Sequence, residues 1–170
     1  CVIGDESQTD LRKVGGEAAV IYPIIFDDRL EVLATHGDDV RRHTTWISAK
    51  DLSDTVDTFR ASLQRTSDDR NLKVAGASLY RALVGPFVEM LQPDRVDVLV
   101  FVPDGPLRTV PLAALWNEGA GRYLIEEFAV ANTLGLTLTN PQRFTRAQAQ
   151  VLTAGISQAI TRGNHCLLYT

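Results

Sequence analysis

The segment that most constrains the fold is the apolar run from Val96 to Val102, which Pro103-Asp104-Gly105-Pro106 interrupts. A short, valine-rich run bounded by proline and glycine is typical of a strand buried on both faces. Proline fixes one backbone dihedral and glycine supplies a positive φ, so a tight turn is predicted next. Since α/β folds place working loops at the ends of buried strands, Asp104 and Gly105 are candidates for a ligand or partner contact. The sequence favours the structural alternative, in which the Asp104 side chain accepts a backbone hydrogen bond and Gly105 makes the turn.

Apolar periodicity predicts the elements that precede this segment. Strands are expected over residues 18–26, 30–36 and 40–47, and the first two form a β-hairpin. Ser48 is a suitable N-cap with Asp51 as its capping partner. The helix that follows ends near Arg65, and its buried face is predicted from the spacing of Leu52, Val56, Phe59 and Leu63.

A second helix is predicted over residues 74–91, with a kink at Gly85-Pro86 because proline removes a backbone donor. Further strands are predicted over residues 123–131 and 150–156. This order predicts an α/β fold: a mostly parallel sheet flanked by helices, with an antiparallel hairpin at the N-terminal side. The expected organisation is a linker or disordered arm over 1–16, a lobe over 17–139, a linker over 140–149, and a new strand with a tail over 150–170.

Composition excludes several classes of function. The chain has 170 residues, is 45% apolar and 22% charged, and can therefore bury the core of one domain. Its formal net charge of −4 argues against binding to nucleic acids or anionic membranes. No apolar stretch reaches the roughly 20 residues of a membrane span. No phosphate-binding glycine loop is present, and Ser157 lacks the spacing of a serine-hydrolase elbow, so we expect no cofactor.

The two cysteines, Cys1 and Cys166, stand at opposite ends of the chain and do not form a disulfide framework. This usage favours a reducing, cytoplasmic setting, and the start of the chain has no signal-peptide core. Because the first residue is not methionine and a new element opens after residue 150, we expect the chain to be part of a longer protein.

Several short segments of the sequence, taken in order, resemble the opening half of a CHAT domain, a bacterial caspase-related module often found after TPR repeats. No single segment decides the resemblance, but the segments occur in the order of the family, and together they cover roughly residues 17–157. The segments are residues 18–30, Leu79-Tyr80-Arg-Ala-Leu83-Val-Gly-Pro86, residues 98–108, Val110-Pro-Leu-Ala-Ala-Leu115, residues 124–130 and Val151-Leu-Thr-Ala-Gly155.

The resemblance implies a caspase-like fold of the cysteine-peptidase type, in which a cysteine nucleophile and a histidine base stand at the ends of neighbouring parallel strands. In the family these two residues belong to motifs downstream of the strand that residues 151–156 resemble. No catalytic residue is therefore assigned in this chain, and the chain is expected to be inactive alone.

Histidine and cysteine occur elsewhere, and each position has a simpler interpretation. His165 and Cys166 are consecutive, whereas catalytic dyads are distant in sequence, so an incidental tail is favoured over a nucleophile. Cys1 is better explained by the boundary of the chain than as an N-terminal nucleophile. His36 and His43 bracket a turn containing Asp38 and could in principle share a metal ion, but surface strand positions are the favoured interpretation.

Two functions from different classes remain open at this stage. The first is a non-catalytic scaffold or regulatory half of a CHAT-type peptidase, which packs against the catalytic half of the same protein and couples it to an upstream sensor such as a TPR array. In that case the loops at 103–105 and 117–122 are candidates for the contact between the halves. The second is a self-sufficient interaction module that oligomerises through an uncovered strand. A small-molecule-binding domain lacks the convergent polar groups that it would need.

Overall fold

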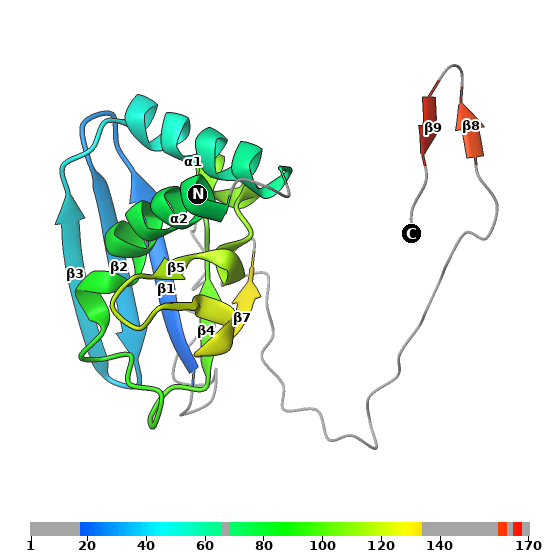
Figure 1. Cartoon of the computed structure of the whole chain (residues 1–170). Helices are drawn as coiled ribbons and strands as arrows, with labels where there is room; N and C mark the ends of the chain where they lie inside the picture. The colour runs from blue at the N-terminus through cyan, green and yellow to red at the C-terminus, as the bar shows by residue number, and fades with distance from the viewer. Residues whose placement is uncertain (1–17, 66–68, 134–159, 163–164, 168–170) are drawn as a thin grey trace, which may run out of the picture.

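The computed structural model describes residues 18–65, 69–133, 160–162 and 165–167. Its main feature is a five-stranded sheet in the order β3-β2-β1-β4-β7 (Figure 1). The strands are β1 (Ala18–Ile25), β2 (Leu30–His36), β3 (Asp39–Thr45), β4 (Val98–Phe101) and β7 (Ala129–Asn132). β2 pairs antiparallel with β1 and β3, while β4 pairs parallel with β1 and β7, so β2 alone runs against the other four. The predicted α/β class and the N-terminal antiparallel hairpin are confirmed.

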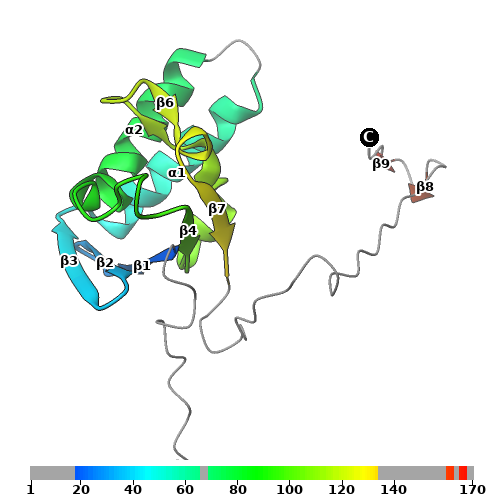
Figure 2. The same ribbon diagram turned by 90° about the horizontal axis from the view of Figure 1, so that it is seen from below.

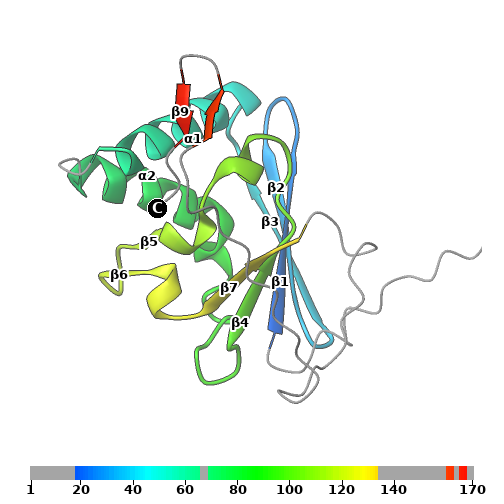
Figure 3. The ribbon, with the colours of Figure 1, turned by 90° about the vertical axis from the view of Figure 1, so that its right-hand side faces the viewer.

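Two helices, α1 (Ala49–Leu63) and α2 (Asp69–Leu83), lie together over one face of this sheet (Figures 2 and 3). The prediction of a sheet flanked by helices therefore holds for one face of the described part. The core lies between the sheet and this helical layer. Its fully buried large side chains include Ile21, Leu30, Leu52, Phe59, Leu79, Leu83, Phe87, Leu99 and Phe101.

The first helix follows the sequence prediction closely. The Ser48 hydroxyl accepts a hydrogen bond from the Asp51 backbone amide at 3.1 Å and donates to the Asp51 carboxylate at 2.7 Å. These bonds satisfy an amide that would otherwise lack a partner in the first turn. Leu52, Val56 and Phe59 are buried at the predicted spacing, whereas the prediction is wrong for Leu63, which ends the helix and is 37% exposed.

The second helix differs from the prediction at both ends, since it starts at Asp69 and stops at Leu83. The expected kink at Gly85-Pro86 is wrong, because the chain leaves the α-helix there. The last helical bond runs from the Val84 amide to the Tyr80 carbonyl at 2.8 Å, and a 3₁₀ turn, η2 (Gly85–Phe87), follows. Pro86 has no amide to continue the ladder and its ring would clash with the preceding turn. The tighter turn still buries Phe87.

The strand predicted over residues 123–131 is also wrong in its first half. A short hairpin, β5 (Trp116–Asn117) with β6 (Arg122–Tyr123), leads into a 3₁₀ turn, η5 (Leu124–Glu126), and only then into β7. The Glu126 carboxylate accepts the Tyr123 amide at 2.6 Å, and the Leu124 amide donates to the Leu115 carbonyl at 2.9 Å. These bonds hold the chain in a turn and bury Leu124.

Near the end of the chain, β8 (Ile160–Arg162) and β9 (His165–Leu167) form a separate two-stranded hairpin. The segments predicted over 1–16, 140–149 and 150–156 lie outside the described residues. Among the residues that the structure describes, no helix is both long and apolar enough to cross a membrane.

Candidate functional site

The carboxyl ends of β1, β4 and β7 meet at one edge of the sheet because the three strands run parallel. Asp104 lies at this edge, and its carboxylate pairs with the Arg108 guanidinium at 3.4 Å. Both side chains are more than half exposed, so the pair contributes little stability. The prediction that the Asp104 side chain accepts a backbone hydrogen bond is wrong, since it forms no such cap and the Asp104 carbonyl accepts the Leu107 amide instead.

The turn predicted at Gly105 is confirmed. Gly105 has a φ of +49° and opens a 3₁₀ turn, η3 (Gly105–Thr109), in which Leu107 is fully buried. A Cβ added to Gly105 would stand 3.3 Å from the Cδ1 atom of Ile25 at the end of β1. The glycine therefore permits both the backbone conformation and the close approach to β1, a structural role that needs no ligand.

The strand register separates the two histidines that could have shared a metal ion. His43 lies opposite Val32, whereas His36 lies opposite Asp39, four positions further along β2. Four strand residues span about 13 Å, which is too far for two ligands of one ion. The His43 ring instead packs edge-on against Phe87, with ring centroids 6.4 Å apart. Within the described ranges, no group of three or more His, Cys, Asp or Glu side chains could hold a metal ion, so the metal alternative is not supported.

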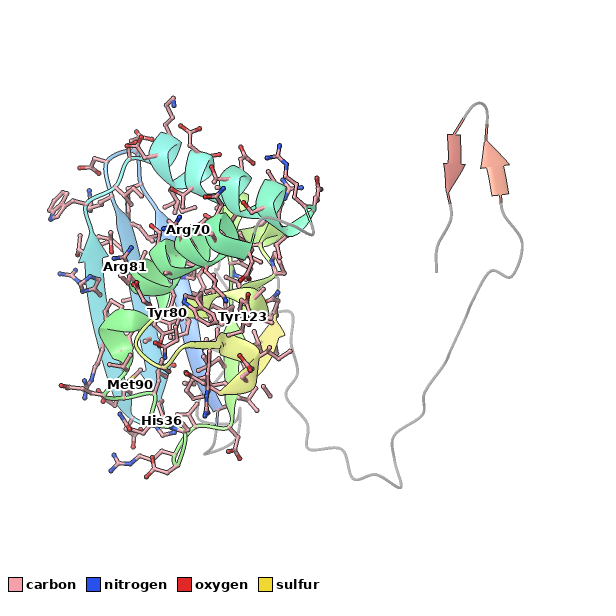
Figure 4. All side chains as sticks on the ribbon, viewed as in Figure 1. His36, Arg70, Tyr80, Arg81, Met90 and Tyr123 are labelled. Carbon is pink, nitrogen blue, oxygen red and sulfur yellow. The ribbon has the colours of Figure 1, made fainter. Side chains whose placement is uncertain are left out.

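His36 also lies at the wrong end of the sheet to act as a catalytic base. It pairs with Ala19 at the start of β1, and Figure 4 shows it at the end of the sheet away from α1. His165 and Cys166 are successive residues of β9, opposite Arg162 and Thr161. Their side chains, like Cys1 and Ser157, lie outside what the structure describes. The described residues thus contain no cysteine–histidine pair at the carboxyl edge.

The described part is hollowed beside the β5–β6 hairpin, on the helical side of the sheet. One cleft of about 270 Å³ and another of about 310 Å³ share two lining residues, Tyr80 and Asn117. The Asn117 side-chain amide donates to both Glu127 carboxylate oxygens, at 3.0 and 3.2 Å, while its oxygen accepts the Ala120 amide at 3.2 Å. The loop at residues 117–122, predicted as a surface loop, is therefore fixed to the body of the lobe by Asn117.

The tyrosines near this hairpin were not anticipated as part of a site. Burial raises the pKa of Tyr80 to about 12, and the negative charge of Glu127 adds to the shift. Tyr123, labelled with Tyr80 in Figure 4, packs edge-on against Trp116 with ring centroids 4.8 Å apart, and its hydroxyl donates a hydrogen bond to Asp69 at 3.3 Å. The one signal in the sequence that indicates burial of Tyr80 is the apolar spacing of α2, which places Tyr80 beside Leu83. A titration this far above neutral pH supplies no catalytic base.

The face of the sheet turned away from the helices carries a second set of apolar side chains. In β1, residues alternate between the core, represented by Ala19 and Ile21, and this opposite face, represented by Tyr22. The register extends the opposite face across the neighbouring strands. We call it the far face, and its apolar members are Val20, Tyr22, Ile24, Leu33, Val98 and Val100. No described helix covers this face (Figure 3).

The sheet is also open along β7. This four-residue strand pairs with β4 on one side and with no described strand on the other. Ala129, Ala131 and Asn132 are exposed there. Parallel strands in α/β proteins are normally buried on both faces and flanked by further strands or helices. The far face and the β7 edge are therefore the surfaces at which additional structure would complete the fold.

The CHAT domain family model matches residues 73–167, which is more than half of the chain. The chain belongs to the CHAT domain family. The match runs from α2 through β4, the turn at Gly105 and β7 to β9. The comparison with curated proteins gives no match.

Membership makes this CHAT domain a caspase-like member of a cysteine-peptidase family, and the mixed α/β sheet agrees with that fold. The matched range contains the parallel strands β4 and β7, whereas β1, β2, β3 and α1 precede it. These earlier strands nevertheless belong to the same sheet as the matched strands, because β1 pairs directly with β4.

Proposed function

We propose that this lobe is the non-catalytic half of a caspase-like cysteine peptidase. It packs against the catalytic half of the same protein and couples that half to an upstream sensor such as a TPR array. In this proposal the protein works in the reducing cytoplasm of a bacterium.

The observation that carries the proposal is the apolar far face beside the open β7 edge. Tyr22 is 40% exposed on this face, and Val98 and Val100 of β4 are only half-buried. Burying an exposed side chain of this size fully is worth about 1.5–3 kcal/mol, and a partner that covers these half-buried side chains gains a part of this value from each. Apolar side chains gathered on a sheet face that no described helix covers are typical of an interaction site.

Coupling to a sensor requires a second surface that faces away from the catalytic half. A groove of about 430 Å³ runs between α1 and α2, and its lining includes Asp51, Asp54 and Val74. Val74 is 63% exposed, although it is apolar. Stacked helical repeats bind through extended helical surfaces, so this groove is the region that we assign to the sensor.

The experiment is a binding and activity assay with the two halves supplied as separate polypeptides. We expect the 170-residue chain alone to cleave no peptide substrate, and to bind the separately supplied catalytic half. Val100→Lys on the far face should weaken this binding at least about tenfold, because a charge would be buried in an apolar contact. Val74→Lys is the matched control, since it makes the same change on the helical layer.

Peptidase activity of the chain alone would overturn the proposal. Equal effects of the two lysine substitutions would also contradict it, because the far face would then have no special role. If the chain binds only itself, the alternative of a self-sufficient oligomerisation module is supported instead. Sedimentation of the chain at several concentrations separates these outcomes.

A further inference from the structure

The outer edge of β3 is a second open edge of the sheet, on the side opposite to β7. β3 has seven residues, and all seven pair in unbroken register with β2, from Thr45 opposite Leu30 to Asp39 opposite His36. No described strand pairs with its other side (Figure 1). The outward-facing backbone groups of a regular edge strand form a template for another strand.

Natural proteins usually block such an edge, and β3 lacks most of the blocking features. It contains no proline, it has no bulge, and it is as long as its neighbour β2. What it carries instead is charge at its centre, in Arg41 and Arg42, followed by His43. In a chain of net charge −4, this is a local basic segment on a strand that keeps its pairing geometry.

The two arginines differ in how far acidic neighbours compensate them. Arg41 pairs with Asp39 at 3.0 Å and lies 3.7 Å from Glu89. Arg42 is 72% exposed, and its nearest carboxylate is Glu31 at 3.9 Å. Glu31 already accepts stronger hydrogen bonds from Thr44, at 2.8 Å, and from Arg29, at 3.0 Å. Arg42 is therefore the charge on this edge that is most available to a partner.

Exposed apolar side chains flank the basic centre. Val40 is 65% exposed and Trp46, which directly follows β3, is 77% exposed. Tryptophan and arginine are the residues most enriched at the energetic centres of protein interfaces. An exposed tryptophan beside an unpaired strand edge thus adds a contact that a bound strand could use.

Charge disfavours a second copy of this chain as the partner, because the register that pairs the whole of β3 with its copy is centred on Arg42. An antiparallel pair of β3 strands related by a two-fold axis at Arg42 would place Arg42 opposite Arg42 and Arg41 opposite His43. Like charges directly opposite each other in a ladder destabilise the pairing. A strand with acidic residues at these positions would instead gain cross-strand ion pairs.

We propose that the β3 edge binds an extended, acidic segment of a partner protein, which adds to the sheet as an antiparallel sixth strand. The backbone ladder supplies affinity, carboxylates opposite Arg41 and Arg42 fix the register, and apolar residues cover Val40 and Trp46. The added strand pairs with the outer edge of β3 and not with the far face or β7, although Val40 and Arg42 project from the same side of the sheet as Leu33. The inference therefore goes beyond the proposed function.

The test uses the whole chain and a designed peptide of sequence Thr-Val-Glu-Glu-Val-Thr-Val, with both ends blocked and a fluorescent label. Fluorescence anisotropy should show saturable binding that weakens with added salt. A peptide with lysine at both glutamate positions should bind at least about tenfold more weakly. A third peptide, N-methylated at alternate residues to remove the ladder donors, should lose binding whatever its charge.

The protein variants make the test specific to this edge. Arg42→Glu should weaken binding of the acidic peptide at least about tenfold and should improve binding of the lysine peptide. A general loss of folding cannot reverse the preference between the two peptides. Arg60→Glu on α1 is the matched control, and it should leave both affinities unchanged. The Arg60 side chain is 46% exposed and lies outside β3.

Three results would overturn the inference. The first is the absence of binding to the acidic peptide up to about 1 mM, a dissociation constant that corresponds to a binding free energy of only about 4 kcal/mol. The second is equal affinity for the acidic and the lysine peptides, and the third is an equal effect of Arg42→Glu and Arg60→Glu on peptide binding. Each would mean that the arginines serve only to prevent edge-to-edge association. None of them affects the binding test at Val100, so the proposed function and this inference fail separately.

Discussion

Gly76 of α2 lies directly against the backbone of Trp116 in β5. A Cβ atom placed on Gly76 would stand 3.3 Å from the Trp116 amide nitrogen and 3.1 Å from the Cε2 atom of Phe59. Phe59 belongs to α1 and is fully buried. Two helices and the β5–β6 hairpin therefore meet at a point where no side chain has room, and this contact sets the position of the hairpin on the lobe.

We expect Gly76→Ala to destabilise the protein although alanine is the better helix former. The gain in helix propensity is about 1 kcal/mol. The added methyl group meets a buried ring on one side and a backbone nitrogen on the other, and overpacking of this kind costs about 1–3 kcal/mol. Urea unfolding should show a net loss of about 1 kcal/mol.

Gly119→Ala is the control for this prediction. Gly119 lies in the hairpin turn, and the nearest atom to an added Cβ is the Asn117 side-chain oxygen at 3.5 Å, an ordinary contact. Its free energy of unfolding should change by less than about 0.5 kcal/mol. An increase in stability for Gly76→Ala would show that α2 and β5 can separate without cost.

The sequence predicts those elements whose signals are local. Ser48 caps the start of helix α1 because its hydroxyl reaches the Asp51 amide, three residues away. The end of α2 was missed because Gly85-Pro86 is compatible with both a kinked helix and a new turn, and either of them can bury Phe87. The strand predicted to start at Tyr123 forms a turn there instead, because the Leu124 amide bonds to the Leu115 carbonyl. The alternation of apolar residues does not encode this contact.

For the candidate site, the residue types in the sequence predicted local backbone geometry, but they did not predict which side chains lie close together. A turn with a positive φ at Gly105 follows from proline and glycine alone. The separation of His36 from His43 depends on the register of β2 and β3, which shifts by whole residues with the length of the connecting turn. The one-sided helical layer, and hence the far face, depends on how strands from distant parts of the sequence are ordered.

Removal of the Ser48 hydroxyl should destabilise the start of α1. Ser48→Ala deletes the hydrogen bond to the Asp51 amide and should lower the free energy of unfolding by about 1 kcal/mol. Ser53→Ala inside the same helix removes a hydroxyl without removing a cap, and alanine should leave stability unchanged or slightly higher there. Equal losses for the two variants in thermal unfolding would argue against the cap.

Glu31 should report the hydrogen bond that joins β2 to β3. The Thr44 hydroxyl, and then Arg29, lowers the pKa of the Glu31 carboxyl below its ordinary value. Thr44→Val removes the hydroxyl at nearly constant shape, so we expect the Glu31 pKa to rise in a carboxyl NMR titration. Because the pKa is lowered in the fold, the stabilisation is present above the ordinary carboxyl pKa and is lost as the pH falls. Thr45→Val, whose hydroxyl forms no contact with Glu31, should leave the titration unchanged.

Tyr80 should make the fold sensitive to alkaline pH. Burial raises its pKa to about 12, whereas an unfolded tyrosine titrates near 10. The fold therefore favours the neutral phenol, and its contribution is complete below about pH 10 and is lost as the pH rises towards about 12. The loss amounts to about 2–3 kcal/mol over this interval, since each pKa unit corresponds to about 1.4 kcal/mol.

Comparison with Tyr80→Phe isolates this effect from the other groups that titrate at alkaline pH. The phenylalanine variant cannot ionise at this position, so the difference in unfolding free energy between the two proteins should shift in favour of the variant as the pH rises from about 9 to about 11. Tyr123→Phe is the matched control, because the more exposed Tyr123 should give a smaller pH-dependent difference. A constant difference between wild type and Tyr80→Phe across this interval would mean that the Tyr80 phenolate reaches solvent through the adjoining cleft without unfolding of the lobe.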